Sequence, residues 1–270
     1  AIAGRLELLR RRLSDEGSRG ADIRLALDGL EEAATDLARA SRVDDGVPVA
    51  PQLLTELARF EAALDCFHEA LAIRREIGDV SGMAQTLNNL GTIHQDHGEH
   101  ARASEVWLEA LEYARTVGDR MREAVILTNL GESHYRQGHP GEGISVLQEA
   151  DRISATLGDR ILEAEILRGL AKAHLLLADR SAALGYIERS VKTFERARSK
   201  PFLGVALRTL AEVEASFAPD VEAQRRAESA YRQSLALFDE LGADALARGA
   251  GVGDFIFVSG VVAGYATGED

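Results

Sequence analysis

Histidines are the residues in this chain with the clearest capacity for chemistry, because closely spaced histidines bind zinc. His94, His97 and His100 form the densest group. His94, however, recurs at equal intervals as His134 and His174, which indicates a repeated structural position rather than a ligand. His97 and His100 have no cysteine or carboxylate pattern beside them that would complete a site. The sequence therefore predicts no metal centre.

Motifs for other chemistry are also missing from the sequence. It has no glycine-rich phosphate loop, nucleophile elbow or paired cysteines. The glycine-rich segment Gly249–Gly253 precedes a strand-like run, so a flexible linker is a better interpretation than a nucleotide loop. Cys66 is the single cysteine and lies among apolar neighbours, which predicts a buried, unreactive thiol. We expect no catalytic residue and no cofactor.

Composition narrows the possible partners. The chain has 270 residues, a hydrophobic content of 46% and a formal net charge of −13. An acidic surface repels phosphate backbones and anionic lipids, so neither nucleic acid nor a membrane is an expected partner. No apolar run is long enough to span a bilayer, and one cysteine fits a reducing compartment, so we expect a cytoplasmic protein. The first residue is Ala1 rather than Met, which favours a piece of a longer protein.

A pattern that repeats at a constant interval dominates the chain. The pair Gly-Asp occurs at Gly78-Asp79, Gly118-Asp119 and Gly158-Asp159, and in the same register Leu-x-x-Leu is followed by Gly91, Gly131 or Ala171. A weaker fourth copy starts at Leu207. Such self-similarity, with a period of about 40 residues, predicts stacked units that cannot each bury an apolar face alone.

Each unit is predicted to be a pair of amphipathic helices, such as 81–97 and 101–117. Gly98 and Gly138 lie where the two helices turn, and glycine tolerates the left-handed geometry of a helix end. In Gly-Asp the glycine ends one helix and the aspartate caps the next. A small residue inside a helix costs stability, so the recurrence at Gly91 indicates close contact between helices.

These units resemble tetratricopeptide repeats, whose first helix carries W-x2-L-G-x2-Y and whose second carries A-x3-F. The matching residues in the first unit are Leu87, Leu90, Gly91 and His94, followed by Ala103, Trp107 and Ala110. The unit is longer than is usual in this family and lacks a closing proline, features that are similar to the repeats of kinesin light chains and bacterial regulatory proteins. The resemblance implies an all-α, right-handed α-solenoid, with His94, His134 and His174 packed between helices where the family has tyrosine.

The domain organisation follows from this register. We expect N-terminal helices that form a cap at 1–45, a repeat array at 46–247, and a glycine-rich linker with a strand-like or disordered tail at 248–270. Within the array, 57–77 and 221–241 are predicted to be second helices of less regular units.

The tail resembles the opening strands of Rid-type imine/enamine deaminases. The matching residues are Gly253-Asp254, Phe257, Ser259-Gly260 and Thr267-Gly268-Glu269, whereas Val261 replaces the family's usual glutamine. The segment is too short for a catalytic domain, and the family's active-site arginine would lie beyond Asp270.

Stacking places the first helices along the concave side of a solenoid. Their side chains outside the core are the candidate peptide-binding residues: Gln85, Asn88, Asn89, Thr92, Gln95, Thr128, Asn129, Glu132, Arg136, Glu165 and Arg168. Carboxamides can donate to and accept from a peptide backbone at once. Asn89 and Asn129 fit equally well as residues that bond within their own repeat.

The sequence therefore predicts a non-catalytic scaffold that binds a protein or peptide. Two alternatives stay open: a sensory or regulatory module of a multidomain bacterial signalling protein, and an N-terminal appendage of a deaminase-like enzyme. A domain of the same polypeptide or a second copy of the chain is an alternative partner.

Overall fold

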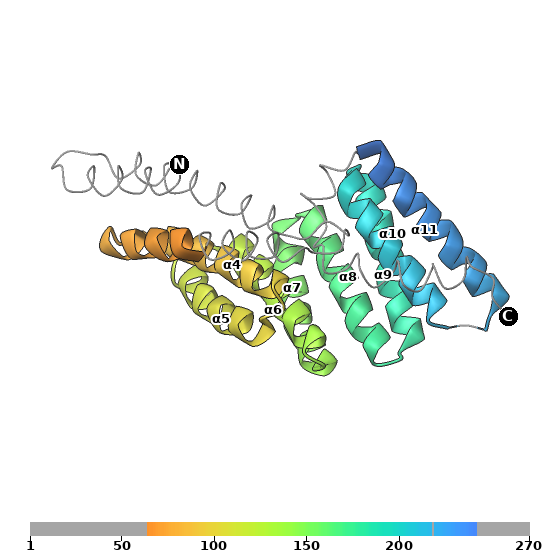
Figure 1. Ribbon diagram of the computed structural model, residues 1–270, viewed down its shortest axis with the longest axis horizontal. Helices are drawn as coiled ribbons and strands as arrows, with labels where there is room; N and C mark the ends of the chain where they lie inside the picture. The colour runs from red at the N-terminus through yellow and green to blue at the C-terminus, as the bar shows by residue number, and fades with distance from the viewer. Residues whose placement is uncertain (1–63, 218, 242–270) are drawn as a thin grey trace, which may run out of the picture. The chain divides into compact units, whose positions relative to one another are not determined.

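A computed structural model describes residues 64–217 and 219–241, and in these residues the regular structure is α-helical (Figure 1). The predicted fold class, an all-α solenoid of tetratricopeptide-like helix pairs, is confirmed for this part of the chain. The expected N-terminal cap, the strand-like tail and the deaminase-like segment all lie outside the described residues.

The chain divides between Arg122 and Glu123 into two compact units. The first unit contains a helix described from residue 64 to residue 76, followed by α4 (Val80–Asp96) and α5 (His100–Thr116). The second contains most of α6 (Arg120–Arg136), then α7 (Pro140–Leu157), α8 (Arg160–Leu176), α9 (Arg180–Ala197), α10 (Lys200–Ala215) and α11 (Val221–Leu241). The predicted helices at 81–97, 101–117 and 221–241 agree with α4, α5 and α11 to within one residue.

Every unit of the sequence repeat contains two turns, one within the hairpin and one before the next hairpin, so turns occur at half the repeat interval. Left-handed backbone occurs at 78, 98, 118, 138, 158, 178 and 198, with glycine at every one of these positions except Ala178 and Arg198. Gly98 and Gly138 have φ of 78° and 85°, as the sequence predicts for the helical turn. At Ala178 and Arg198, φ is 56° and 54°, so non-glycine residues bear a conformation that glycine adopts without strain.

Aspartates cap the helices that follow several of these turns. The Asp79 carboxylate accepts from the Gly82 amide at 3.1 Å, and the Asp119 carboxylate accepts from the Arg122 amide at 2.9 Å. Asp159 caps α8 through the amides of residues 161 and 162, both at 2.9 Å. The Gly-Asp pair therefore acts as predicted: one residue ends a helix and the next starts another.

In the first unit, α4 and α5 form an antiparallel hairpin in which Gly91 of α4 packs against the indole of Trp107 on α5. Trp107 is fully buried, and a Cβ added to Gly91 would lie 2.4 Å from the indole Nε1. The indole N–H donates to the Asn88 carbonyl at 3.1 Å. The close helix contact predicted from Gly91 is confirmed.

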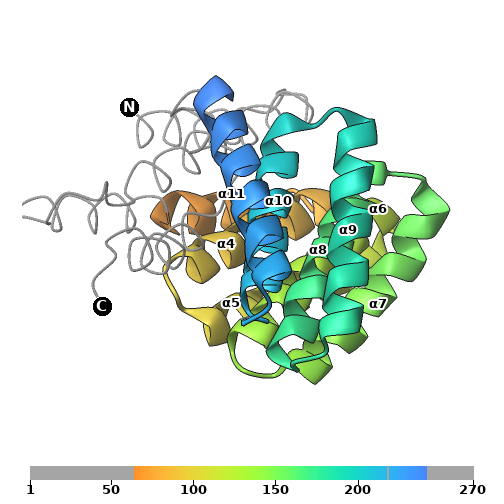
Figure 2. The same cartoon turned by 90° about the vertical axis from the view of Figure 1, so that its right-hand side faces the viewer.

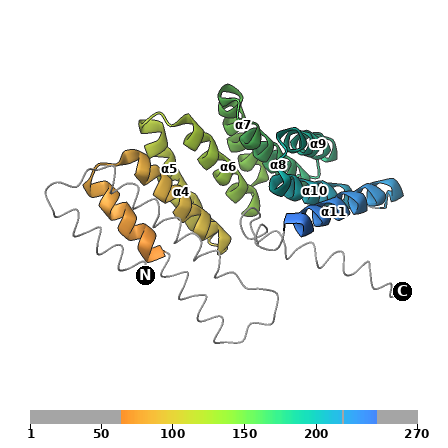
Figure 3. The ribbon, with the colours of Figure 1, turned by 90° about the horizontal axis from the view of Figure 1, so that it is seen from above.

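The second unit uses the same position with smaller side chains. A Cβ at Gly131 would lie 2.5 Å from Leu147 Cγ, so α6 and α7 pack as closely as α4 and α5. In the next hairpin Ala171 and Ile187 both belong to the core shared by α8, α9, α10 and α11. Figures 2 and 3 show these last helices stacked side by side, each packed on its neighbour.

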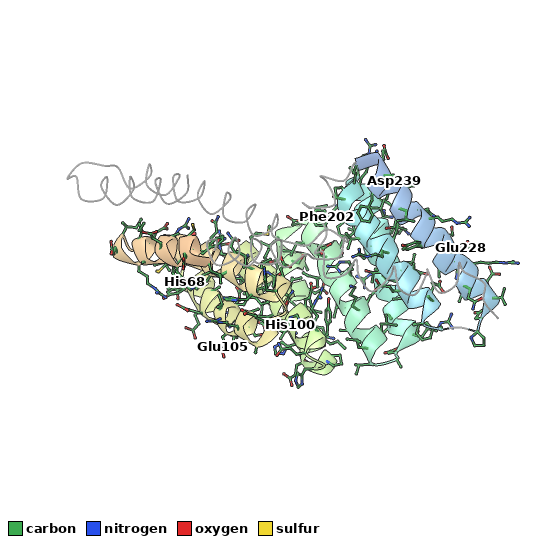
Figure 4. The ribbon with its side chains drawn as sticks, viewed as in Figure 1. His68, His100, Glu105, Phe202, Glu228 and Asp239 are labelled. Atoms are coloured by element: carbon green, nitrogen blue, oxygen red, sulfur yellow. The ribbon has the colours of Figure 1, made fainter. Side chains whose placement is uncertain are left out.

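Helix α11 ends the described array. Its apolar side, which includes Ala227, Ala230 and Phe238, packs on α10. Glu228 and Asp239 are exposed and lie on the side away from α10 (Figure 4).

Candidate functional site

The α4 part of the candidate site is uncharged. Gln85, Asn88, Asn89, Thr92 and Gln95 follow one another at helical spacing, Thr92 exposed and the other four half-buried. They lie beside the buried residues Leu87 and Leu90, which face the core. This helix therefore presents amides and a hydroxyl, groups that can donate as well as accept hydrogen bonds.

Some of these groups already bond within α4 and its hairpin. The Thr92 hydroxyl donates to the Asn88 carbonyl at 3.1 Å, and the same carbonyl accepts from the Trp107 indole. Asn88, Asn89 and Asn129 each take part in an interaction in the structure. Both interpretations of the asparagines, ligand contact and bonds within the repeat, therefore stay open.

The α6 part of the site combines polar and charged groups. The Thr128 hydroxyl donates to the Ala124 carbonyl of its own helix at 2.8 Å, which uses its proton. Arg136 binds the Glu132 carboxylate through two nitrogens, at 2.8 Å and 2.7 Å. Both nitrogens contact the same oxygen, Glu132 Oε1, and this pair one helical turn apart holds both side chains on one face of the helix.

The α8 part of the site continues this ion network. Arg168 Nη2 lies 2.9 Å from Glu165 Oε2 on its own helix and 4.0 Å from Glu132 Oε2 on α6. Its side chain is only 9% exposed, whereas those of Glu132 and Glu165 are 18% and 21% exposed. The predicted residues Glu132, Arg136, Glu165 and Arg168 thus form one charged cluster within the second unit. A ligand at this face would meet paired charges, in contrast to the amides of α4.

The sequence reasoning left out Arg208, which belongs with this set by its position. It lies on α10, one full repeat after Arg168, and is 3% exposed. The signal was present in the repeat Leu207-Arg208-Thr209-Leu210, which has the register of Leu167-Arg168-Gly169-Leu170. The weaker overall similarity of the fourth copy hid the recurrence of arginine.

The three repeated histidines pair with carboxylates at the start of the second helix of their own hairpin. His94 Nδ1 lies 2.6 Å from Glu99 Oε2, His174 Nδ1 lies 3.3 Å from Asp179 Oδ2, and His134 Nδ1 lies 3.5 Å from Glu142 Oε2. Only His94 is fully buried; the other two are half-buried. Packing between helices thus holds for His94 and in part for its two equivalents.

The described part of the chain has no group of three or more histidine, cysteine, aspartate or glutamate side chains arranged to hold a metal. His97 Nδ1 instead lies 3.2 Å from the Ile93 carbonyl of its own helix. Cys66 is a half-buried free thiol, so the predicted full burial was wrong. Partial burial, with smaller contributions from the Glu69 and Asp65 charges, raises the pKa of the Cys66 thiol. A raised thiol pKa lowers the thiolate fraction at neutral pH, which fits the predicted lack of reactivity.

None of the described helices combines the length and the apolar character needed to cross a membrane.

The tetratricopeptide repeat family model matches residues 52–116 and, in a second register, residues 82–154. No curated protein matches the chain. Neither result gives support to the Rid-type resemblance of the tail.

Solved structures share the fold at low sequence identity. The nearly identical TPR-like repeats of a protein designated a kinesin light chain in Podosopora anserina are 14% identical, with a TM-score of 0.56 over 76% of this chain and 94% of that one. A Signal Transduction ATPase with Numerous Domains (STAND) protein with a tetratricopeptide repeat sensor, from Pyrococcus horikoshii, is 18% identical, with a TM-score of 0.56 over 98% of this chain and 43% of that one. A Rap protein complexed with Competence and Sporulation Factor is 14% identical, with a TM-score of 0.56 over 87% of this chain and 77% of that one.

The family match, the constant repeat interval and the glycine-to-indole hairpin agree with one another. Residues 52–154 therefore match tetratricopeptide repeats, and the described part of the chain has an all-α, solenoid-type fold.

Proposed function

We propose that this chain is a non-catalytic scaffold that binds a protein or peptide on the outward-facing sides of its first helices. The observation that carries the proposal is that the first helix of each hairpin has two different sides, one packed on the second helix and one polar. Gly91 of α4 and Gly131 of α6 lie where each helix contacts the second helix of its hairpin. Polar side chains occupy another side of both helices, at equivalent positions of the repeat. Side chains that the core does not need are available for recognition.

The chemistry of α4 suits an extended backbone. Amide side chains supply both donors and acceptors, so they can match the N–H and C=O of a bound peptide with little regard to its sequence. Specificity would then come from charged residues such as Glu132 and Arg168, which pair with each other in the free protein. A ligand has to supply charges that either fit this pair or take the place of one partner.

Relatives in fold support a role in binding. The Rap protein named above was solved with Competence and Sporulation Factor bound. For this chain the identity of the ligand is a separate question, which a selection experiment can answer.

The test is selection of peptides from a random display library on the purified chain, followed by affinity measurement with Asn89→Ala and Asn129→Ala variants. A lost hydrogen bond in a desolvated contact costs about 1–3 kcal/mol, so each variant should weaken binding at least several-fold with little change in thermal stability. The matched control is Glu105→Gln, an exposed residue on the second helix α5 (Figure 4). If the asparagine variants lost stability rather than affinity, the asparagines would be structural. If all variants bound equally, the ligand surface would lie elsewhere.

A second candidate is a sensory module within a larger signalling protein. It is favoured by the STAND protein, of which the matched region makes up 43%. The test is whether peptides selected on this chain change the activity of the other domains of the full-length gene product. No change on saturation with peptide would count against a sensory role. A cytoplasmic location stays a prediction.

A further inference from the structure

The turn between α8 and α9 is apolar and exposed. Leu176 and Leu177 are 58% and 51% exposed. The equivalent residues are Asp96 and His97 in the hairpin of α4, and Arg136 and Gln137 in the hairpin of α6. The turn geometry therefore does not require leucine, and two exposed leucines in a row need another explanation.

A second turn extends this surface. The Arg180 guanidinium lies 4.5 Å from the centre of the Phe217 ring, and its Nη2 lies 3.9 Å from Asp220 Oδ2. Val221, the next residue, is 61% exposed. The α8–α9 and α10–α11 turns lie at the same end of their hairpins (Figures 1 and 2). We call Leu176, Leu177, Phe217 and Val221 the leucine edge.

Acidic side chains surround the leucine edge. Asp179 and Asp220 are about half exposed, at 49% and 46%, and Glu222 is exposed on the first turn of α11. The buried Glu214 is neutralised by Arg226, whose Nε lies 2.7 Å from its carboxylate.

Two cations lie nearby. Arg180 contributes one positive charge between the two turns, and Arg225 lies one turn further along α11. The three exposed carboxylates of Asp179, Asp220 and Glu222 outnumber these two arginines by one, with Arg180 already paired to Asp220, and the whole chain carries −13. Charge complementarity therefore favours a basic partner.

The size of the surface favours a segment over a second copy of the chain. A stable protein–protein interface buries about 800 Å² on each partner, far more than four side chains supply. An amphipathic segment with two or three apolar side chains can cover this edge, and lysines or arginines beside them can reach the aspartates.

We propose that the leucine edge docks an amphipathic segment of a partner protein in which leucine-like side chains are flanked by lysine or arginine. This surface is separate from the candidate peptide-binding residues, because Leu176 and Leu177 come after Arg168, the last of those residues on α8. The two proposals can therefore fail independently.

The experiment measures fluorescence anisotropy of a labelled synthetic peptide of leucine and lysine in an amphipathic pattern. Two companion peptides replace lysine by glutamate or leucine by serine. The protein variants are Leu176→Gln/Leu177→Gln, which removes the apolar turn without a change of charge, and Asp179→Asn/Asp220→Asn, which removes charge but keeps residues able to cap helices. Leu108→Gln is the matched control, since Leu108 is 55% exposed on α5.

We expect the leucine–lysine peptide to bind and the two companion peptides to bind weakly or not at all. The glutamine double variant should lose about tenfold or more in affinity, because leucine burial supplies most of the binding free energy. The asparagine double variant should lose several-fold at low salt and little at high salt. Leu108→Gln should bind like the unchanged protein.

Three results would overturn the proposal. The glutamine variant could bind as tightly as the unchanged protein while thermal unfolding shows that both are folded. The glutamate peptide could bind as well as the lysine peptide. Sedimentation could show self-association that the glutamine variant abolishes, which would make a second copy the occupant.

Discussion

The hairpins α4–α5 and α8–α9 have the same framework but differ at three kinds of position. Their framework leucines, Leu87 and Leu90 in one and Leu167 and Leu170 in the other, are all buried. Around this framework the core pair, the outward-facing polar residues and the turn have changed. The comparison shows which parts of a repeat the fold requires and which are available for function.

Each hairpin has a core pair, one residue from each helix, and the two pairs divide the buried volume differently. In α4–α5 a glycine lies under a tryptophan, whereas in α8–α9 Ala171 accompanies Ile187. The larger second-helix side chain is matched by the smaller first-helix residue. Interiors are close-packed, so one member of such a pair constrains the other.

The polar residues of the first helix change in charge and in size. Asn88 of α4 is replaced by Arg168 in α8, which pairs with Glu165 at 2.9 Å. The turns change from Asp96-His97-Gly98 to Leu176-Leu177-Ala178. Neither change disturbs the helix ends, since the amides of Glu99 and Asp179 both bond back to the preceding helix, at 2.9 Å and 3.0 Å.

The largest expected effect is at the core pair. Trp107→Ala removes a fully buried indole and its hydrogen bond to the Asn88 carbonyl, which should cost about 3–5 kcal/mol of unfolding free energy. Ile187→Ala in the second hairpin should cost less, about 2–4 kcal/mol, because a smaller volume is lost. Urea denaturation of the two variants measures the difference. A loss below about 1 kcal/mol for Trp107→Ala would contradict its place in the core.

The next effect concerns glycines in helix interiors. Gly91→Ala places a Cβ about where the indole lies, 2.4 Å from Nε1, and should destabilise the hairpin by about 1–3 kcal/mol. Gly185→Ala is the matched control, since nothing lies within 4 Å of its added Cβ. There the better helix propensity of alanine should stabilise the protein by about 0.5–1 kcal/mol. Thermal unfolding should shift in opposite directions, and a shift in the same direction for both would refute the close contact.

A smaller effect on stability is expected at the hairpin turns, where Gly98 and Ala178 occupy equivalent positions. Gly98 has φ of 78°, so Gly98→Ala introduces strain of about 1 kcal/mol. Ala178 has φ of 56° and bears this strain already, so Ala178→Gly should stabilise by up to about 1 kcal/mol despite the greater entropy of the unfolded chain. The urea midpoints should therefore move in opposite directions. Arg198→Gly, at φ of 54°, repeats the test at the next turn.

The smallest effect concerns Cys66, which lies in the helix before α4. Because its pKa is raised, the thiolate fraction at neutral pH is lower than in a free thiol, and alkylation should be slower. The rate of iodoacetamide labelling should rise with pH along a curve displaced to higher pH than that of a cysteine in a short unstructured peptide. A curve at the same or lower pH, with equal final labelling, would contradict the effect of burial.

Much of the fold was predictable from the sequence because its signals are local. The Gly-Asp pairs set the helix boundaries, and the leucine spacing set the buried face, so α4 and α5 were predicted to within one residue. The family model covers residues 52–154, whereas the same helix pairs continue to Leu241. Weaker signals were enough there because apolar spacing persists when motif residues change.

The candidate site was only partly predictable, for a physical reason. Helical spacing predicted that the set from Gln85 to Arg168 faces outward, but Arg168 is an exception because its side chain is only 9% exposed. Which charged side chains form ion pairs depends on distances between helices, and residue spacing within one helix does not determine those distances. The 4.0 Å approach of Arg168 to Glu132 joins α8 to α6 and is a property of their packing.

The sequence by itself determined the repeat, the helix boundaries, the caps and the small-residue positions, because each depends on neighbours within one or two turns of chain. Only the tertiary structure decided that Gly91 lies under the Trp107 indole, that four charged residues of the candidate site share one network, and that Arg180 of the leucine-bearing turn lies over Phe217 of the next. Each of these relations joins different helices or turns. They follow from how the hairpins pack, since residues far apart in sequence meet only when burial of the apolar faces brings their helices together.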